Sequence, residues 1–77
     1  MFIKINNIPE NLNEFSSLLN IIKNKKLEDY KTGFDLELDY FKVFLYFISE
    51  YENIKENNDI FSNFHSFINV SISKFIN

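Results

Sequence analysis

PENLNEFSSLLNIIKNKK, residues 9–26, has the clearest helical pattern in the chain. Apolar residues recur here at alternating steps of four and three, which places them on one face of a helix. Including the residue just before the segment, they are Ile8, Leu12, Phe15, Leu19 and Ile22. Pro9 suits the first turn of a helix, where its missing N–H group leaves no hydrogen bond unmade, and Lys23 and Lys26 suit the negative end of the helix dipole. We therefore predict a helix near 9–26.

The next regular pattern has a different period. Over residues 34–38, large apolar residues alternate with Asp and Glu, and this period of two is typical of a half-buried strand. Residues 2–6 alternate in a similar way, because Ile3 and Ile5 are separated by lysine and followed by asparagine. We therefore expect a short two-stranded element in which 2–6 pairs with 34–38.

Two more helices are predicted in the second half of the chain. Residues 39–56 carry apolar residues at helical spacing, and Asp39 stands where an N-cap is needed. Residues 59–76 carry a third such stripe, with Asp59 in the corresponding position. The predicted fold class is therefore mainly α, a small three-helix domain with the short two-stranded element added.

Parts of these two helices also fit strands. Residues 40–48 are rich in Phe and Tyr, as a buried strand is, and residues 66–73 alternate between apolar residues and Asn or Ser. Val, Ser and Asn also have low helix propensity. The alternative is therefore an α+β fold with additional strands at 40–48 and 66–73.

Length and composition exclude several classes of function. The chain has 77 residues, which fits a single domain spanning 1–77. Its single Gly excludes the glycine-rich loops that hold phosphates in nucleotide-binding enzymes. With no Cys and a single His, it offers neither a disulfide nor a usual zinc site, and His65 has no partners for a catalytic triad in its own stretch of sequence. We therefore expect no enzymatic activity, no metal and no cofactor.

Charge and hydropathy limit the partners. The net charge is −3 and the chain has no Arg, so direct binding to nucleic acid or to an anionic membrane surface is disfavoured. The longest apolar run, residues 43–48, is far shorter than the roughly 18 residues that a membrane-spanning helix needs. Because cysteines and an N-terminal export signal are both missing, we expect a cytoplasmic protein.

A row of three acidic residues is the first functional candidate. Asp35, Glu37 and Asp39 alternate with apolar residues, so a strand would present all three carboxylates on its solvent-facing side. A solvated strand face explains this row without any function. A ridge that faces a basic partner surface is the functional interpretation, whereas a cation site would need further oxygen ligands from elsewhere.

An excess of aromatic residues is the second candidate. The chain has ten Phe and four Tyr, and so small a body leaves part of its apolar surface exposed. Tyr40, Tyr46 and Tyr51 suit half-buried positions at a protein interface, where Tyr is enriched. The alternative is a core that long side chains simply fill. These three tyrosines and the acidic row are the predicted partner-binding residues.

Together these features predict a small acidic protein that inhibits or regulates a larger protein by stoichiometric occlusion. The expected partner is a protein, for example a nucleic-acid-handling complex with a basic surface. In size, acidity and AT-rich codon usage, the chain resembles small inhibitors of phages and mobile elements, such as anti-CRISPR proteins, antitoxins and bacteriocin immunity proteins. This resemblance is one of type and involves no motif. The alternative function is a structural homodimer without a separate target.

Overall fold

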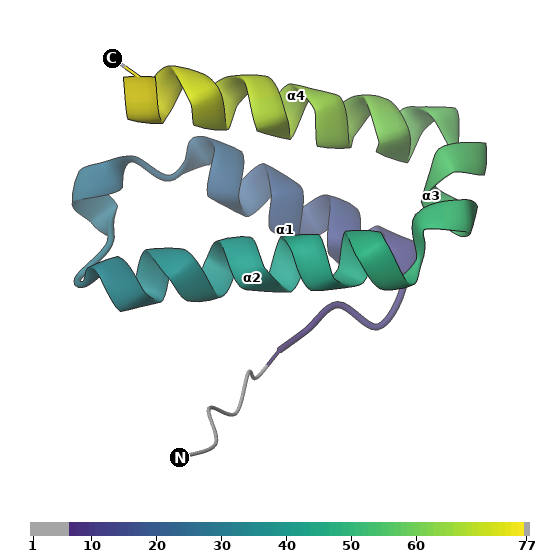
Figure 1. Ribbon diagram of the computed structural model, residues 1–77, viewed down its shortest axis with the longest axis horizontal. Helices are drawn as coiled ribbons and strands as arrows, with labels where there is room; N and C mark the ends of the chain where they lie inside the picture. Colours follow the sequence, from purple (N-terminus) through teal and green to yellow (C-terminus); the bar gives the residue numbers. More distant parts are fainter. Residues whose placement is uncertain (1–6, 77) are drawn as a thin grey trace.

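The computed structural model describes residues 7–76 and is mainly helical (Figure 1). Its elements are α1 (Leu12–Asn24), the 3-10 turn η1 (Leu27–Asp29), α2 (Gly33–Ser49), α3 (Tyr51–Glu56) and α4 (Asn58–Ile76). The predicted mainly α class is confirmed, and residues 7–76 contain no strand. Helices α1 and α4 run in the same direction, and α2 runs opposite to both.

The first helix begins later than the proline suggested. Asn11 is the N-cap, because its side-chain oxygen accepts a hydrogen bond from the backbone N–H of Glu14 at 2.9 Å. Pro9 is buried in the segment that precedes the helix. The prediction of a helix near 9–26 is therefore correct in place and too long at both ends.

The predicted strand at 34–38 is wrong, because these residues form the first turns of α2. Thr32 caps this helix by accepting a hydrogen bond from the backbone N–H of Asp35 at 3.1 Å. A helix that is apolar on two opposite sides can imitate a period of two over five residues, which explains the error. The proposed partner strand at 2–6 lies outside the described residues. The alternative strands at 40–48 and 66–73 are also wrong, since both segments are helical.

The predicted helix 39–56 is two helices. The chain bends at Glu50, whose φ of −116° and ψ of 24° separate α2 from the short α3. The predicted third helix is confirmed as α4, but its cap is Asn57, not Asp59. The side chain of Asn57 accepts a hydrogen bond from the backbone N–H of Ile60 at 3.2 Å.

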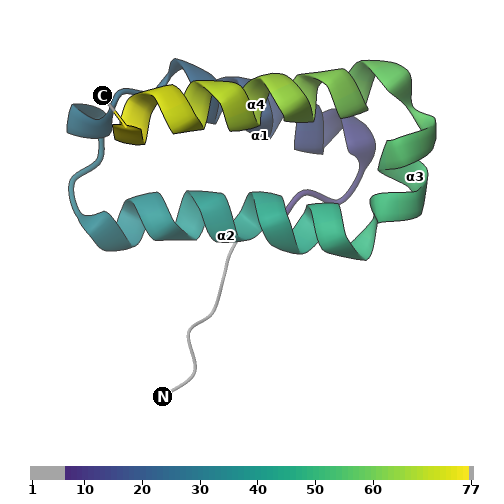
Figure 2. The ribbon, with the colours of Figure 1, turned by 45° about the horizontal axis from the view of Figure 1, so that its top comes forward.

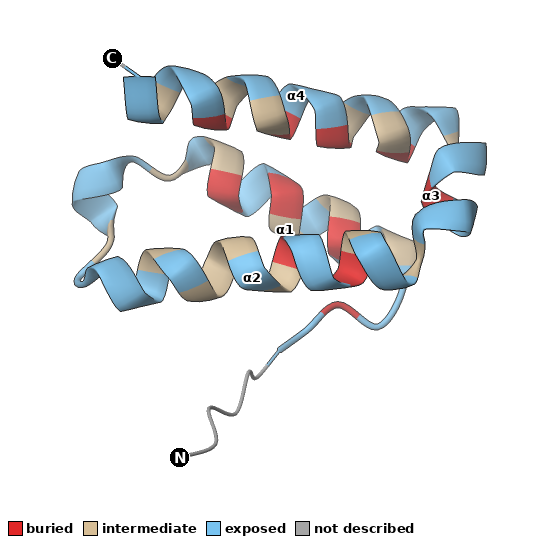
Figure 3. Ribbon diagram, viewed as in Figure 1, coloured by how far each residue is buried: buried red, intermediate tan, exposed pale blue. Residues whose placement is uncertain are grey.

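The core lies between α1 and α4, with α2 and α3 closing it (Figure 3). Its buried members are Phe15, Leu19, Ile22, Val43, Tyr46, Ile54, Ile60, Phe64 and Phe67. Close backbone approaches are most numerous between α1 and α4, which lie one over the other in the view of Figure 2. Lysines also join these two helices, because Lys74 Nζ donates to the carbonyl oxygen of Ile22 at 2.7 Å and Lys23 Nζ donates to Asn63 Oδ1 at 2.6 Å.

Helix α2 contacts α4 mainly through aromatic rings. Few backbone positions of these two helices come within 8 Å of each other. The rings of Phe47 and Phe64 stack with centroids 3.9 Å apart, and Phe44 meets Phe67 at 6.4 Å in an edge-to-face arrangement. None of the helices in the described part has the length and apolar character needed to cross a membrane.

Candidate partner-binding surfaces

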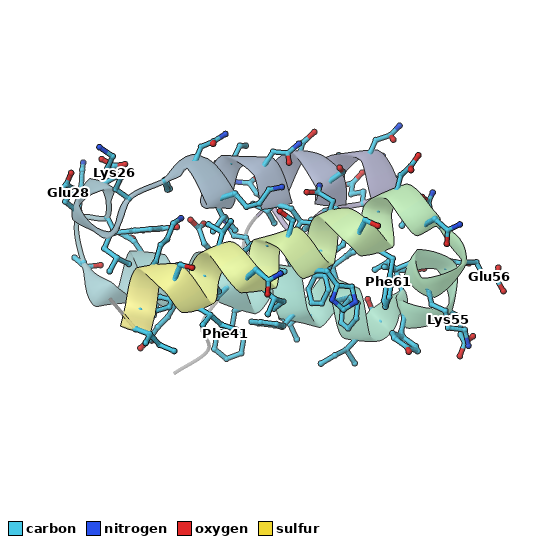
Figure 4. All side chains as sticks on the ribbon, turned by 90° about the horizontal axis from the view of Figure 1, so that it is seen from above. Lys26, Glu28, Phe41, Lys55, Glu56 and Phe61 are labelled. Carbon is cyan, nitrogen blue, oxygen red and sulfur yellow. The ribbon has the colours of Figure 1, made fainter. Side chains whose placement is uncertain are left out.

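The side of α2 that faces away from the core is apolar. Five residues spaced by four and three positions form this side, which we call the α2 outer face: Phe34, Leu38, Phe41, Leu45 and Ile48. Phe41 is 56% exposed and Ile48 is 72% exposed. Figure 4 shows Phe41 projecting away from the bundle. The outer face therefore offers large apolar side chains that the fold itself does not cover.

A shallow apolar groove adjoins the α2 outer face. The groove has a volume of about 310 Å³, and its lining includes Tyr40, Phe41 and Phe44, with Glu37 as the single charged member. Tyr40 also contacts Phe75 near the end of α4, with ring centroids 5.8 Å apart. Ile72, Phe75 and Ile76 are all exposed at that end. The apolar surface thus extends from α2 to the C-terminal end of α4.

The predicted acidic row does not form, because its residues lie on a helix and point in different directions. Successive residues of a helix are rotated by about 100°, so Asp35 and Asp39 share one side and Glu37 lies on the other. Asp39 is half-buried and pairs with Lys25 Nζ at 3.3 Å and with Lys42 Nζ at 4.0 Å. Asp35 and Glu37 are exposed. The three carboxylates therefore do not form a continuous acidic row.

The three predicted tyrosines occupy three different environments. The Tyr40 hydroxyl is hydrogen-bonded to Ser71 Oγ at 2.9 Å, next to the apolar groove. Tyr46 belongs to the core, where its ring lies 4.9 Å from that of Phe15. Tyr51 is exposed on α3, with the ammonium group of Lys55 5.7 Å from its ring centroid. The structure does not gather them into one patch.

A second surface is an open acidic cleft at the α3 end of the molecule. Its volume is about 770 Å³, and its lining includes four carboxylates that come from three separate parts of the chain: Glu10, Glu50, Glu56 and Asp59. Several asparagines complete the lining, and it contains no lysine from the described residues. Figure 4 places Glu56 at the opposite end of the molecule from Lys26 and Glu28. Sequence reasoning missed this cleft because only folding brings these residues together.

Tyr46 links the core to the acidic cleft. Its side chain is only 7% exposed and it is one of the residues that line the cleft. Burial raises the pKa of the Tyr46 hydroxyl, and the nearby carboxylates of Glu50 and Glu14 raise it further. The hydroxyl makes no hydrogen bond to any residue within 7–76. It is therefore a neutral polar group with free hydrogen-bonding capacity beside the carboxylates.

The opposite end of the molecule has paired charges instead. Lys25 lies between Asp39 and the ring of Tyr30, whose centroid is 4.4 Å from the ammonium group. Burial raises the pKa of the Tyr30 hydroxyl, and the Asp39 carboxylate adds to this effect. Within residues 7–76, no group of three or more carboxylate or imidazole side chains is placed to hold a metal ion. Ion pairs of Asp39 with Lys25 and Lys42 thus mark this end, whereas the acidic cleft lies at the α3 end.

No protein-family model, curated protein or solved structure matches the chain. Two surfaces of the described residues stand out, one apolar on α2 and one acidic beside α3. Neither surface places a nucleophile next to a base, as covalent catalysis would require.

Proposed function

We propose that this protein is a non-enzymatic binding protein that inhibits or regulates a larger protein by covering part of its surface through the α2 outer face. One observation carries the proposal, namely that α2 is apolar on two opposite sides and only its inner side is buried. An apolar side of a helix is normally packed against another element. We therefore infer that a partner covers the outer face.

The exposed apolar area supports this proposal. A large apolar side chain presents roughly 150–250 Å² when fully exposed. By this measure, the outer face and the exposed end of α4 together present on the order of 800 Å², about what each partner buries in a stable protein interface. Apolar patches of this size on small proteins usually mark interaction sites. The small size and net charge of −3 favour the class of inhibitors that phages and mobile elements encode, the anti-CRISPR, antitoxin and immunity types.

The spacing on the outer face favours one second candidate, a structural homodimer. Residues that repeat at steps of four and three form a seam that packs against another helix with the same spacing. Two copies of α2 can therefore pair about a two-fold axis, each burying the same residues of the other. In that case, the outer face would be used between copies and not on a separate target.

A matched pair of variants tests the proposal. Phe41→Ser with Ile48→Ser makes the outer face polar, whereas Ile21→Ser changes a residue on α1 that is 57% exposed, almost the same as Phe41. We expect the wild-type protein to be a monomer by light scattering and to form a complex of one-to-one stoichiometry with a protein captured from its host cell and then purified. The outer-face variant should lose this complex, and Ile21→Ser should keep it.

Two results would contradict the proposed function. A wild-type dimer that the outer-face variant converts to a monomer, with no other protein bound, would establish the homodimer instead. A partner that binds both variants as well as it binds the wild-type protein would show that the outer face is not the binding surface.

A further inference from the structure

The acidic cleft shares no residue with the α2 outer face, and it indicates a second kind of contact. We propose that this cleft binds a basic segment of a protein partner, with the guanidinium group of an arginine side chain held between the cleft carboxylates and the Tyr46 hydroxyl. The inference goes beyond the proposed function because it does not depend on what covers α2.

The carboxylates of the acidic cleft have no neutralising charge from the described residues. Glu10, Glu56 and Asp59 line the cleft without an ion pair to any described residue. The Glu50 carboxylate accepts its one hydrogen bond from a described residue, the neutral side-chain amide of Asn53, at 2.6 Å. Lys55, the lysine nearest to Glu56 in the sequence, already forms an ion pair with Glu52, with its Nζ 3.0 Å from Glu52 Oε2. Concentrated carboxylates in a concave site attract a cationic ligand.

Helix stability explains only part of this acidity. Glu10 and Asp59 lie near the N-termini of α1 and α4, where the helix dipole favours negative charge. Glu56 instead ends α3, where the dipole of that helix favours cations, while Glu50 lies between the C-terminus of α2 and the N-terminus of α3. The charge of Glu56 does not serve the helix that carries it. A role in binding accounts for the position of Glu56 in the cleft.

Tyr46 is more than nine-tenths buried, lines the cleft, and has its hydroxyl close enough to the Glu50 carboxylate for that charge to raise the hydroxyl pKa. A phenylalanine ring would pack on Phe15 equally well, so the core does not require the hydroxyl. This hydroxyl has no partner within residues 7–76, and its oxygen can accept a hydrogen bond from an N–H group of a ligand. The carboxylates and the hydroxyl therefore offer acceptors side by side.

The chemistry of these acceptors favours arginine. A guanidinium group is planar and has five N–H donors, so it can meet a carboxylate through two hydrogen bonds and still donate to a hydroxyl. The volume of about 770 Å³ exceeds that of one side chain, so the cleft has room for the neighbouring residues of a segment. The absence of a three-ligand cluster among residues 7–76 argues against a metal ion as the occupant.

The test uses the full chain and a defined probe, acetyl-tetra-arginine amide, followed by amide chemical shifts in NMR at low salt. The control peptide is acetyl-tetra-citrulline amide, which has nearly the same shape without the charge. We expect saturable shifts confined to α3 and the residues that flank it, with a Kd of about 0.1–1 mM for such a short peptide. The citrulline peptide should cause no saturable shift.

Three variants locate the contact. Glu50→Gln with Glu56→Gln should weaken arginine-peptide binding about tenfold. Glu28→Gln with Asp35→Asn removes the same charge from the opposite end and should change the Kd by less than about twofold. Tyr46→Phe should weaken binding about threefold while leaving the urea midpoint unchanged, because the ring packing is retained.

The outcomes separate this inference from the proposed function. Equal losses in the two charge variants, equal binding of the citrulline peptide, or tighter binding of spermine than of the arginine peptide would overturn it. Phe41→Ser with Ile48→Ser should bind the arginine peptide like the wild-type protein. A failure of partner capture would therefore leave the peptide result intact, and the reverse also holds.

Discussion

The two opposite sides of α2 are similarly apolar, but one is buried and the other is exposed. The inner side, with Val43 and Tyr46, is buried against α1 and the core, whereas Phe41 and Ile48 on the outer side remain exposed. The difference arises from the neighbours, because α1 and α4 can cover only one side of a third helix. An apolar side chain is therefore a candidate for the core, and the packing around it decides whether it is buried. The surplus on α2 is available to a partner.

The largest expected effect separates the two sides directly. Phe15→Ala removes a fully buried ring that packs on Tyr46, so it should lower the free energy of unfolding by about 3–5 kcal/mol. Phe41→Ala should change it by less than about 0.5 kcal/mol, because the outer ring is mostly exposed and alanine favours helix. Urea denaturation followed by far-UV circular dichroism measures both. If the Phe15→Ala variant does not fold, Phe15→Leu replaces it, and we expect this variant to lower the free energy of unfolding by less than Phe15→Ala. Equal effects for Phe15→Ala and Phe41→Ala would show that both rings are buried in solution.

Phe44 lies between the two sides and sharpens the comparison. It is 39% exposed, but its ring centroid is 6.3 Å from that of Phe64 and 6.4 Å from that of Phe67. Phe44→Ala should therefore cost about 1–2 kcal/mol, less than a core ring and more than an outer one. The same denaturation experiment applies. A cost as small as that of Phe41→Ala would place Phe44 on the outer face.

A smaller effect is expected where α2 meets the end of α4. Tyr40→Phe removes the hydrogen bond to Ser71, which is 92% buried, and should cost about 1 kcal/mol. A double-mutant cycle with Ser71→Ala isolates the pair, and we expect a coupling energy of about 0.5–1.5 kcal/mol. Strictly additive effects of the two substitutions would mean that the hydroxyl groups are not bonded in solution.

The smallest effect concerns a third, polar side of α2, where Tyr30 adjoins Asp39. Burial and this carboxylate raise the pKa of the Tyr30 hydroxyl above its ordinary value of 10.0, so the folded state favours the neutral form. The unfolded chain releases this proton first, and the contribution to stability is full below about pH 10 and is lost as the pH rises further.

Comparison with Tyr30→Phe isolates this contribution. Urea titrations at several pH values give the free energy of unfolding of both proteins. Between pH 9 and pH 11, this free energy should fall for the wild-type protein relative to the variant. Burial lowers the pKa of Lys74, which has the opposite effect in the same range, but this lysine is present in both proteins and cancels. A constant difference between the two proteins across this range would contradict the shift.

Much of the helical content was predictable from sequence. The stripe that includes Phe15, Leu19 and Ile22 identified α1, and all three residues are buried. The segment 34–38 misled because α2 is apolar on opposite sides, which imitates the alternation of a strand over a short window. The bend at Glu50 has no proline or glycine to indicate it.

The candidate surfaces were predictable only in part. The excess of aromatic residues indicated exposed apolar area, and its position on α2 followed from the structure. Tyr46 was selected for an interface and lies in the core, with its hydroxyl toward the acidic cleft. Glu10 and Asp59 are close only because α1 and α4 begin at the same end of the bundle. Contacts of this kind depend on tertiary structure, and no local pattern encodes them.

The aromatic layer between α2 and α4 has a consequence for motion. Because α2 is attached to α4 mainly by rings such as Phe47 and Phe64, and comes close to α1 at fewer positions than α4 does, we expect it to detach more readily than α1 and α4 separate from each other. The amide protons of α2 should therefore exchange with solvent before those of the buried turns of α1 and α4. The bundle would then consist of a stable pair, α1 and α4, and a less firmly attached third helix, α2. A partner that binds the α2 outer face would slow amide exchange throughout α2, including on the inner side, which the partner does not contact.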